Sequence, residues 1–476
     1  MTGPPPRPGR VLAIVSIAVF MASLDLFIVN IAVPKLAGDF PGTGLGTLSW
    51  VLNGYAIVFA ALLVPAGRIA DRVGRRRAFA GGVALFTLAS ALCGAAPSVG
   101  ALIAARVLQA VGAAFLMPTS LALLLPAFPP QKRPVAIGVW AAVGAVAAAC
   151  GPTLGGVRVE ASWRLVFFVN VPVGLLAVLL AVRHLQEARD PTARHPDLLG
   201  TALLVVGISL LSLGLVQAPE WGWGDGRTVA ALATAAVALT GFAGHCAHAA
   251  EPVVDPSLLR VRSYALANLA MLLFGAAFAA WLFLNVLYFT DVWGWSTLHA
   301  GIALTPGPVM TAVTAVIGGR LAVRHGQRLL ATTGCLLFAA AAAWVAWRIR
   351  GDVVYASVEL PAWLIGGTGI GLVLSNLSSA AAASLPPARF ATGSAVITMS
   401  RQTGSVLGVA IAVALIGGAA TAGDAAAAVH VFGVAWWFVA GTAAAAALMS
   451  FAIGRIVLPA RPSAQGPESA AATAPV

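Results

Sequence analysis

Long apolar runs, separated by short loops that carry most of the charges, make up nearly all of this chain of 476 residues. A bilayer core of about 30 Å requires roughly 20 apolar residues per helix. Runs of this length lie at about 11–33, 48–67, 78–97, 101–126, 135–157, 163–185, 197–217, 228–249, 264–289, 296–319, 329–347, 355–378, 392–418 and 430–455. The pattern predicts an all-α polytopic membrane protein with fourteen transmembrane helices, of which the seventh and eighth have the weakest signal and could be broken or tilted.

The composition agrees with a membrane protein and excludes a soluble one. Hydrophobic residues make up 60% of the chain and charged residues only 9%, with a mean hydropathy of +0.93, whereas soluble domains carry about 25% charged residues. Each of the four cysteines is alone in an apolar run. Neither disulfide bonds nor a zinc site is therefore expected.

The distribution of Lys and Arg predicts the orientation of the chain. The net charge of +12 could indicate nucleic-acid binding, but nearly all the basic residues lie in short loops between apolar runs. With the N-terminus in the cytoplasm, 20 Lys and Arg lie on the cytoplasmic side and 6 on the outer side, as the positive-inside rule requires. We therefore expect a multi-pass protein of the cell (inner or cytoplasmic) membrane, with both termini in the cytoplasm and no nucleic-acid partner.

A short internal repeat indicates a duplicated architecture. Residues 67–76 read GRIADRVGRR and residues 319–328 read GRLAVRHGQR, with six of ten positions identical at a spacing of 252 residues. The topology of a membrane protein explains the shared arginines but not the aligned glycines. The repeat predicts two equivalent halves, as in transporters built from parallel repeats.

Six motifs stand out along the chain: LDLFIVNIAVP at 24–34, GRIADRVGRRR at 67–77, ARVLQAVGAA at 105–114, GPTLGG at 151–156, WRLVFFVNVPVG at 163–174 and SRQTGSVLGVA at 400–410. Together they resemble the motifs of the major facilitator superfamily, and in particular those of its 14-helix drug:proton antiporter subfamily. The resemblance implies a major facilitator fold, in which two six-helix bundles are joined by two additional transmembrane helices. It also implies proton-coupled export of drugs or antibiotics by alternating access.

The expected domain organisation follows from the repeat and the predicted helices. It consists of a cytoplasmic N-terminal tail at 1–10, an N-terminal six-helix bundle at 11–185, a linker with transmembrane helices 7 and 8 at 186–262, a C-terminal six-helix bundle at 263–456 and a disordered cytoplasmic tail at 457–476.

Three ionisable residues lie well inside the predicted helices, namely Asp25, Arg106 and Arg401. A charge at the bilayer centre costs about 2.5–3.5 kcal/mol on insertion scales, so each one requires a partner or a cavity. Asp25 can gain and lose a proton during a transport cycle, and a nearby Arg106 would favour release of that proton. The resemblance implies the same proton-coupling role. The alternatives are a neutral, hydrogen-bonded Asp25 and a purely structural ion pair.

Two further motifs predict conformational roles. In the loop formed by Gly67, Asp71, Arg72, Gly74 and Arg75, a carboxylate next to arginines or to a helix N-terminus can hold the cytoplasmic side closed as a latch. In the antiporter motif formed by Gly151, Pro152, Gly155 and Gly156, proline bends the helix and glycines allow close helix contact. Ordinary topology and ordinary glycine packing are the respective alternatives.

A substrate cavity is expected near the midplane between the halves. Its candidate lining residues are Asn30, Asn53, Tyr55, Gln109, Phe274, Trp281, Asn285, Asn376, Thr398, Arg401 and Gln402. Arg401 and Gln402 could instead close the interface of the second half. Glu359 and Asp291, near outer helix ends, are expected to be solvated rather than coupling groups.

These features predict an exporter of lipophilic small molecules that is driven by inward proton flow. No metal site, cofactor or ATP is expected, because no histidine pair faces a carboxylate and no Walker lysine is present, and an enzyme would require a catalytic cluster. Membrane lipids and the cargo are the expected partners of a monomer. With so few membrane carboxylates, monocationic, zwitterionic or neutral cargo is expected. A lipid transporter or flippase scaffold and, less favoured by GPTLGG, a proton-coupled uptake system are the alternatives.

Overall fold

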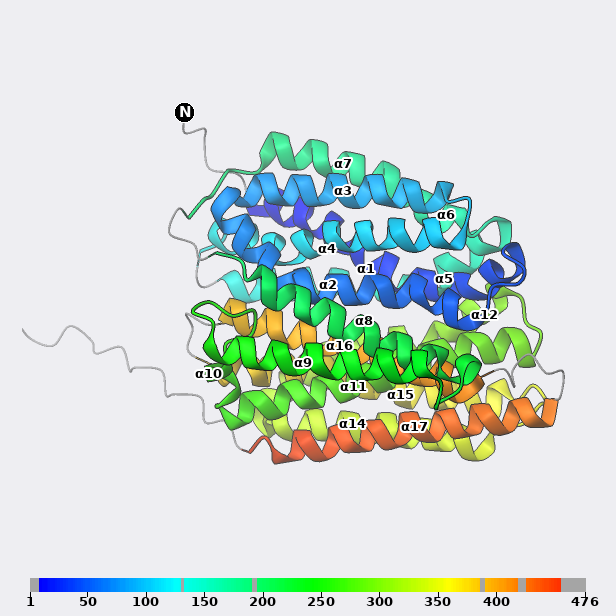
Figure 1. The fold of residues 1–476 in the computed structure, drawn as a ribbon. Coiled ribbons are helices and arrows are strands. Elements are labelled where there is room, and N and C mark those ends of the chain that lie inside the picture. Colours follow the sequence, from blue (N-terminus) through cyan, green and yellow to red (C-terminus); the bar gives the residue numbers. More distant parts are fainter. Residues whose placement is uncertain (1–7, 130–131, 191–194, 386–389, 418–424, 455–476) are drawn as a thin grey trace, which may run out of the picture.

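The computed structural model describes residues 8–129, 132–190, 195–385, 390–417 and 425–454, and within these ranges the fold is entirely helical (Figure 1). Thirteen of the helices described are long and apolar enough to cross a membrane. The predicted disordered tail at 457–476 and most of the predicted N-terminal tail lie outside the described residues. The predicted membrane protein is therefore confirmed, while the count of fourteen helices is approached without being matched.

The first part of the chain forms α1 (Pro8–Asp39), α2 (Leu45–Val73), α3 (Arg75–Ala95), α4 (Val99–Ala127), α5 (Arg133–Ala161), α6 (Arg164–Phe168) and α7 (Asn170–His184). Two helices, α8 (Leu198–Trp221) and α9 (Gly226–His248), follow. The last part forms the short α10 (Pro256–Leu259), then α11 (Arg262–Leu287), η2 (Tyr288–Val292), α12 (Thr297–Leu304), α13 (Pro306–His325), α14 (Gln327–Arg348), η3 (Tyr355–Glu359), α15 (Leu360–Ala383), α16 (Phe390–Ile416) and α17 (Ala425–Ala452).

The helix bounds follow the predicted apolar runs, including the run at 135–157, which falls in the 29-residue α5. The seventh and eighth predicted helices, α8 and α9, are each continuous and not broken. The sixth and tenth are interrupted instead, at Val169 and Thr305. Pro172 and Pro306 follow these breaks, and proline lacks the N–H that would continue the hydrogen-bond ladder.

The two halves of the chain pack in the same way. In the first half α1 packs on α5, α2 on α4, α3 on α4, and α7 on both α1 and α3. The corresponding pairs of the second half are α11 with α16, α13 with α15, α14 with α15, and α17 with both α11 and α14. The repeated loops match as well, because Gly74 and Gly326 both have positive φ angles, of 123° and 82°. The structure thus carries the duplication that the sequence repeat predicts.

Two seams join the halves. At one seam α2 packs on α16, and at the other α5 packs on α12 and α13. Helix α8 packs on both α2 and α16 and on its partner α9, so the additional pair covers the first seam from outside (Figure 1). Helix α8 is therefore in contact with both halves of the bundle, and α9 packs on α8.

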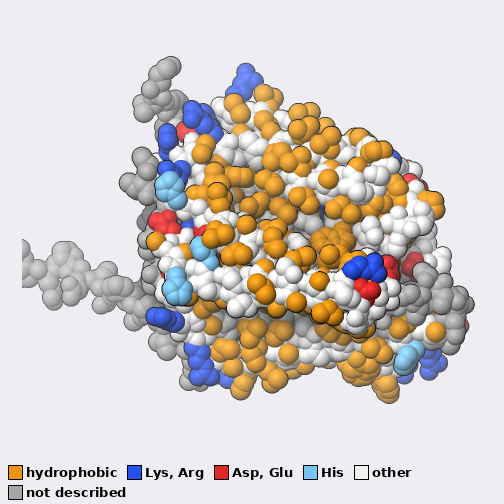
Figure 2. All heavy atoms as spheres, in the orientation of Figure 1, with side chains coloured by type: hydrophobic (Ala, Val, Ile, Leu, Met, Phe, Trp, Pro, Cys, Tyr) orange, Lys and Arg blue, Asp and Glu red, His pale blue; other side chains and the backbone are white. Residues whose placement is uncertain are grey.

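The surface has the pattern of a membrane protein. Figure 2 shows hydrophobic side chains over the middle of the molecule and charged side chains gathered towards the two ends. One end, here called the basic end, carries the junction of α2 and α3 with Arg75, Arg76 and Arg77. Helix α1 begins and α17 finishes at this same end (Figure 1).

Candidate functional site

The two charged residues predicted to act together form an ion pair in the middle of the first bundle. Arg106 of α4 contacts Asp25 of α1 with 2.5 Å between Nη1 and Oδ2, and both residues are 0% exposed. Because both side chains are buried among apolar helices, neither charge is in contact with solvent. A buried pair of this kind is stable only when the remaining polar atoms are also hydrogen-bonded.

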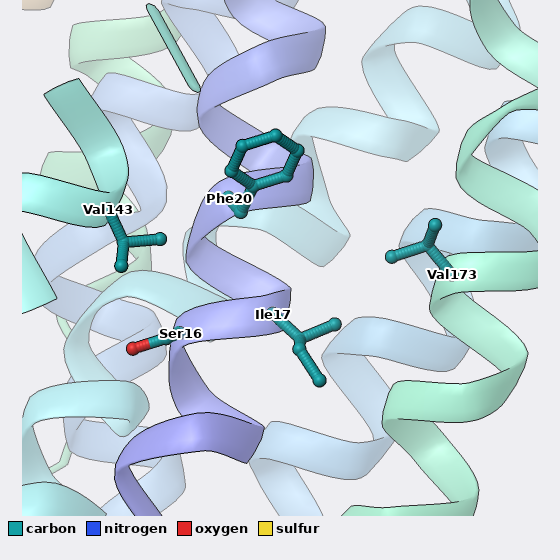
Figure 3. Close-up of a pocket in the computed structure, with 5 residues that line it drawn as sticks. All are labelled: Ser16, Ile17, Phe20, Val143 and Val173. Atoms are coloured by element: carbon teal, nitrogen blue, oxygen red, sulfur yellow. The ribbon is translucent and has the colours of Figure 1, made fainter. Parts of the chain in front are cut away.

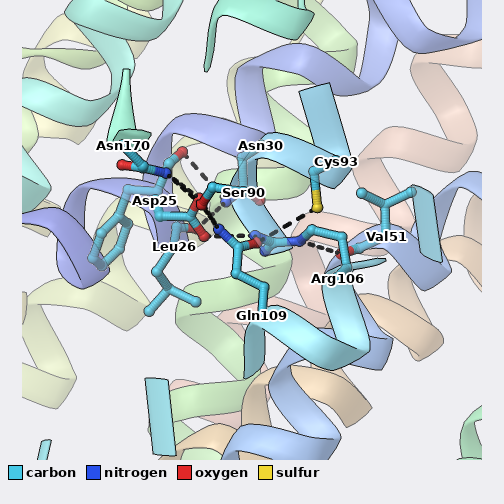
Figure 4. A network of polar contacts seen from close by, with 10 residues as sticks. Asp25, Leu26, Asn30, Val51, Ser90, Cys93, Arg106, Gln109 and Asn170 are labelled. Atoms are coloured by element: carbon cyan, nitrogen blue, oxygen red, sulfur yellow. Dashed lines mark hydrogen bonds and ion pairs between the residues drawn. The ribbon is translucent and has the colours of Figure 1, made fainter. Parts of the chain in front are cut away.

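Uncharged side chains complete the surroundings of Asp25 (Figure 4). Its Oδ1 accepts hydrogen bonds from Gln109 Nε2 at 2.9 Å and from Asn170 Nδ2 at 3.0 Å. Both amides also donate to the hydroxyl of Ser90, at 2.6 and 3.3 Å. Helices α1, α3, α4 and α7 thus meet at one carboxylate, and a change in its charge acts on all four.

Arg106 has partners besides the carboxylate. Its Nε donates to the carbonyl oxygen of Val51 at 3.1 Å, and its Nη1 donates to Gln109 Oε1 at 2.6 Å. Its guanidinium carbon lies 4.2 Å from the centre of the Tyr55 ring, an attractive cation–π position. The guanidinium can therefore stay in place when Asp25 becomes neutral. Once Asp25 is protonated, its carboxyl can separate from Arg106 while the guanidinium keeps its other contacts.

A cavity of about 60 Å³ lies between the halves next to this ion pair. Its wall is formed by Leu26, Phe27, Asn30, Leu52, Asn53, Ala56, Arg106, Phe278, Ala279, Leu282, Arg401, Gln402, Ser405 and Val409, from α1, α2, α4, α11 and α16. Drug-sized ligands occupy sites of about 300–1,000 Å³. The halves must therefore separate before such a molecule can enter.

The structure places some predicted cavity residues on this wall and others elsewhere. Asn30, Asn53, Arg401 and Gln402 line the cavity. Gln109 belongs to the Asp25 network, and Tyr55 packs under Arg106. The remaining five do not line this cavity: Phe274, Trp281, Asn285, Asn376 and Thr398.

Helix α11 shows why the sequence does not identify correctly which residues line the cavity. Phe278 and Leu282, one turn apart, face the cavity, whereas Trp281 and Asn285, also one turn apart, lie in the core of the second bundle. There the Trp281 ring packs against Phe338 and Trp363, with ring centres 5.6 and 5.4 Å apart. Because α11 is apolar on every side, its sequence does not mark the face that is turned to the cavity.

A second hollow lies away from the coupling residues. It has a volume of about 290 Å³ and is lined by Ser16, Ile17, Phe20, Val143 and Val173, from α1, α5 and α7 (Figure 3). Apart from Ser16 its lining is apolar, and none of the candidate coupling residues reaches it. This second hollow has no group that could exchange protons, so the smaller central cavity is the better candidate for the transport site.

The glycines of the antiporter motif permit two close contacts of α5. A Cβ atom on Gly151 would lie 2.9 Å from Phe27 Cβ, and one on Gly155 would lie 2.8 Å from Ile28 Cγ1, so both positions require glycine for packing on α1. On Gly156 a Cβ atom would lie 2.9 Å from both Leu298 Cα and Thr297 O of α12. Helix α5 is continuous through the motif, and the side chain of Pro152 lies outside the described residues.

The predicted latch loop contacts the segment after α7. Asp71 pairs with Arg75 at 2.7 Å within the loop, Asp190 N donates to the carbonyl of Asp71 at 2.8 Å, and Arg75 N donates to the carbonyl of Ala188 at 2.9 Å. Arg189 Nε donates to the carbonyl of Arg72 at 2.6 Å. A Cβ atom on Gly67 would lie 3.5 Å from Pro118 Cβ, which is an ordinary van der Waals distance. The loop is thus joined to the linking segment.

Glu187, and not Asp71 of the loop, caps the N-terminus of α3. Its carboxylate accepts from the backbone N–H groups of Arg76 and Arg77 at 3.0 and 3.3 Å. The preceding Gly74 has no side chain with which to cap the helix, and a Cβ there would lie 2.6 Å from Glu187 Oε1. An anion at a helix N-terminus interacts favourably with the unpaired N–H groups.

Asp197 joins the linking helices to each other. Its side chain accepts from Gly200 N at 2.8 Å and Val253 N at 3.1 Å, and it lies 2.8 Å from His245 Nε2 of α9. Burial alone would raise the pKa of this carboxyl, but the donors Gly200, His245 and Val253 outweigh it and hold the pKa below its usual value. Arg68 of α2 donates to the carbonyls of Glu251 and Pro252, both at 2.9 Å, beside this site.

Glu359 differs from its predicted environment. It is 1% exposed, and its Oε2 has no hydrogen-bond partner among the described residues, so the expectation that it is solvated is wrong. Glu359 ends the helical turn at Tyr355–Glu359, which packs on α14 and α15. Asp291 is exposed, as expected. The described residues contain no group of three His, Cys, Asp or Glu side chains that could hold a metal ion.

Two equivalent helical bundles, with a buried ion pair beside a cavity between them, have the architecture of a membrane transporter. The chain belongs to the Major Facilitator Superfamily, whose family model matches residues 15–409. The resemblance found in the motifs is therefore confirmed.

Relatives of known name are similar over most of their length. The tetracenomycin C resistance and export protein of Streptomyces glaucescens is 34% identical over 408 residues, which is 85% of this chain and 75% of that protein. The multidrug resistance protein Stp of Mycobacterium tuberculosis is 33% identical, with 83% and 73% covered. The cephamycin export protein CmcT of Amycolatopsis lactamdurans is 34% identical, with 88% and 87% covered.

Solved structures share the fold at low identity. A bacterial homologue of the human lysosomal transporter Spinster, in an inward-facing and unoccupied conformation, superposes with a TM-score of 0.66 at 16% identity, over 95% of this chain and 98% of the other. The POT family transporter PepTSo gives a TM-score of 0.68 at 15% identity, over 94% and 97%. At this level of identity the likeness concerns the fold alone.

Proposed function

We propose that this protein exports lipophilic small molecules, such as drugs or antibiotics, in exchange for protons. The observation that carries the proposal is the double position of Arg106, which pairs with Asp25 and also lines the central cavity. A proton on Asp25 weakens that ion pair, and the change reaches the cavity wall through one side chain. The names of the relatives support export as the direction of transport.

The proposed cycle uses contacts between α1 and α5. Asp25 lies two and three residues before Phe27 and Ile28, which pack against Gly151 and Gly155. Protonation removes the charge that holds α1 to α4, so α1 can shift together with α5 and change the contact of Gly156 with α12. Asp25 takes up its proton from the outer side, opposite the basic end, and releases it to the cytoplasm, where the ion pair forms again. No cofactor takes part in this cycle.

The proposed location is the inner membrane, with the basic end in the cytoplasm. The excess of arginine at the basic end supports this orientation through the positive-inside rule. Helix α1 begins and α17 finishes at the same end (Figure 1), which supports a cytoplasmic position for both termini. Tags at residue 1 and residue 476 should both resist a membrane-impermeant label in intact cells. A monomer suffices, because the cavity lies within one chain.

Transport by purified protein in proteoliposomes tests the proposal. Liposomes with the basic end outward, an acidic lumen and a panel of fluorescent or radiolabelled antibiotics outside should accumulate at least one compound. An uncoupler should abolish the accumulation. Accumulation that persists without a proton gradient would contradict proton coupling, and failure over a broad panel would contradict drug export. Movement of labelled phospholipid between leaflets by the same liposomes would favour the lipid-transport alternative.

A further inference from the structure

The central cavity has an unbalanced positive charge on its wall. Two arginines line it, and no Asp or Glu does. The charge of Arg106 is compensated by Asp25. The side chain of Arg401, on α16, forms no hydrogen bond, ion pair or cation–π contact with any residue that the structure describes. One guanidinium is therefore left to interact with whatever occupies the cavity.

The next residue contributes another unpaired donor. Gln402 is 1% exposed, and its Nε2 has no acceptor among the described residues. It lines the same cavity as Arg401. Buried N–H groups are nearly always hydrogen-bonded in folded proteins, so two adjacent donors without acceptors indicate a ligand that supplies acceptor atoms.

The backbone of α16 holds these donors in position. Gly275 and Gly404 bring α11 and α16 together so closely that a Cβ on Gly404 would overlap the carbonyl of Leu272, and one on Gly275 would overlap the carbonyl of Arg401. Ser405 Oγ donates to the carbonyl of Arg401 at 3.0 Å. Because the backbone face at Arg401 is packed against α11, the helix cannot rotate to take the guanidinium out of the cavity.

The rest of the wall is suited to an apolar molecule. Phe27 of α1 and Phe278 of α11 face each other across the seam with ring centres 6.2 Å apart, and Leu26, Leu52, Leu282 and Val409 add aliphatic surface. Planar guanidinium groups bind carboxylates and sulfonate-like oxyanions through two parallel hydrogen bonds. The wall thus combines one anion-binding corner with an aromatic and aliphatic surface.

We propose that Arg401 and Gln402 form an anion-binding subsite, and that the cargo of this exporter is an amphiphilic organic anion with an acidic group on an aromatic or apolar body. This inference rests on the proposed function and identifies its substrate class. It replaces the expectation of monocationic cargo, because a cation in this cavity would meet two arginines and no free carboxylate.

The substrate charge has a consequence for energetics. When one monoanion leaves the cell and one proton enters, two elementary charges move in the direction that an inside-negative potential favours. Export of the anion should therefore be driven by the membrane potential as well as by the pH gradient. Export of a monocation against one proton would move no net charge and would not respond to the potential.

A pair of dyes with the same aromatic body tests the subsite. 1-Anilinonaphthalene-8-sulfonate is anionic, and N-phenyl-1-naphthylamine lacks the sulfonate. In proteoliposomes the wild type should transport the sulfonate, Arg401→Gln should reduce that transport about tenfold with little change for the neutral dye, and Arg401→Lys should retain part of it. Arg262→Gln, which removes an exposed arginine from the start of α11, is the matched control. Equal loss of both dyes in Arg401→Gln, or wild-type transport of ethidium but not of the sulfonate, would overturn the proposal.

A measurement that needs no transport separates this proposal from the proposed function. In a chain whose four cysteines are replaced, Ser405→Cys places a thiol on the cavity wall one turn from Arg401. Its reaction with an anionic methanethiosulfonate should be favoured over reaction with a cationic one, and adding Arg401→Gln should lower that rate ratio about tenfold, because a unit charge at this distance acts strongly in a low-dielectric site. An unchanged ratio would overturn the anion subsite even if export is observed. A changed ratio without export would support the subsite and contradict the proposed function.

Discussion

Ile28 of α1, three residues after the proton-coupling candidate Asp25, occupies the space that the missing side chain of Gly155 leaves on α5. The next residue of α5, Gly156, touches the backbone of Leu298 in the other half. The buried ion pair and the contact between the halves are therefore connected through one helix, by atoms in van der Waals contact. A change in the charge of Asp25 can therefore reach the contact between the two halves, as alternating access requires.

Removal of the Asp25 charge should separate coupling from binding. Asp25→Asn should abolish proton-driven accumulation in proteoliposomes, while exchange of labelled for unlabelled substrate, which requires no net proton movement, should persist. The variant should also unfold at a lower temperature, because breaking a buried ion pair costs about 3–5 kcal/mol, partly offset here by the contacts of Arg106 with Val51 and Gln109. Asp291→Asn, at an exposed acid, is the control. Uncoupler-sensitive accumulation by Asp25→Asn would exclude the coupling role.

Charged positions of the site could be predicted from the sequence, because an isolated charge in an apolar helix must find a partner or a cavity. Asp25 and Arg106 satisfy this condition in the structure. Ser90 and Asn170 were missed, although they complete the network, because neutral polar residues are common in membrane helices and nothing in the sequence pairs them. The only signal for Asn170 was its place as a lone amide in the motif at 163–174.

The side of each helix that faces the cavity is harder to predict from the sequence than the residues at which the helix begins and ends. Helix ends follow from the length of the apolar run, as in α8 and α9, whereas the side of a helix that faces the cavity depends on packing between helices. Trp281 lies in the core while Phe278 lines the cavity because Gly275 and its neighbours fix how α11 meets α16. Glu359 is likewise buried in the fold, although its position near a helix end predicts that it is solvated.

The cap at the start of α3 should matter more than the ion pair in the same loop. Glu187→Ala removes a helix cap, worth about 1 kcal/mol, together with its contacts to Arg76 and Arg77. Asp71→Asn removes only an i,i+4 pair at a half-exposed site, worth about 0.3–0.5 kcal/mol. Protease cleavage between α7 and α8 should accelerate several-fold in Glu187→Ala and less than about twofold in Asp71→Asn. The opposite order would restore Asp71 as the main latch.

The link between α8, α9 and the segment after α9 should depend on pH through Asp197. Its pKa is lowered in the folded protein, so its contribution to stability is complete above the unfolded value of about 3.9 and is lost as the pH falls through the lower folded value. Asp197→Asn should therefore lower the thermal midpoint of the detergent-solubilised protein at pH 7. The difference from wild type should shrink below about pH 4. A difference that is independent of pH would show that shape, and not charge, holds this link together.

Gly156 should control how firmly the end opposite the basic end closes. A Cβ at this position would lie 2.9 Å from two backbone atoms of α12, which cannot move without moving the helix, and overpacking of this kind costs about 1–3 kcal/mol. Gly156→Ala should therefore shift the population several-fold or more towards the state that is open at this end. A cysteine at Ala300 of α12, which is buried here, reports the shift through faster reaction with an impermeant maleimide. Gly144→Ala in the same helix, where the nearest atom is 3.5 Å from the new Cβ, is the control and should react like the parent. If Gly156→Ala also reacts like the parent but fails to transport, the glycine serves some step other than closure.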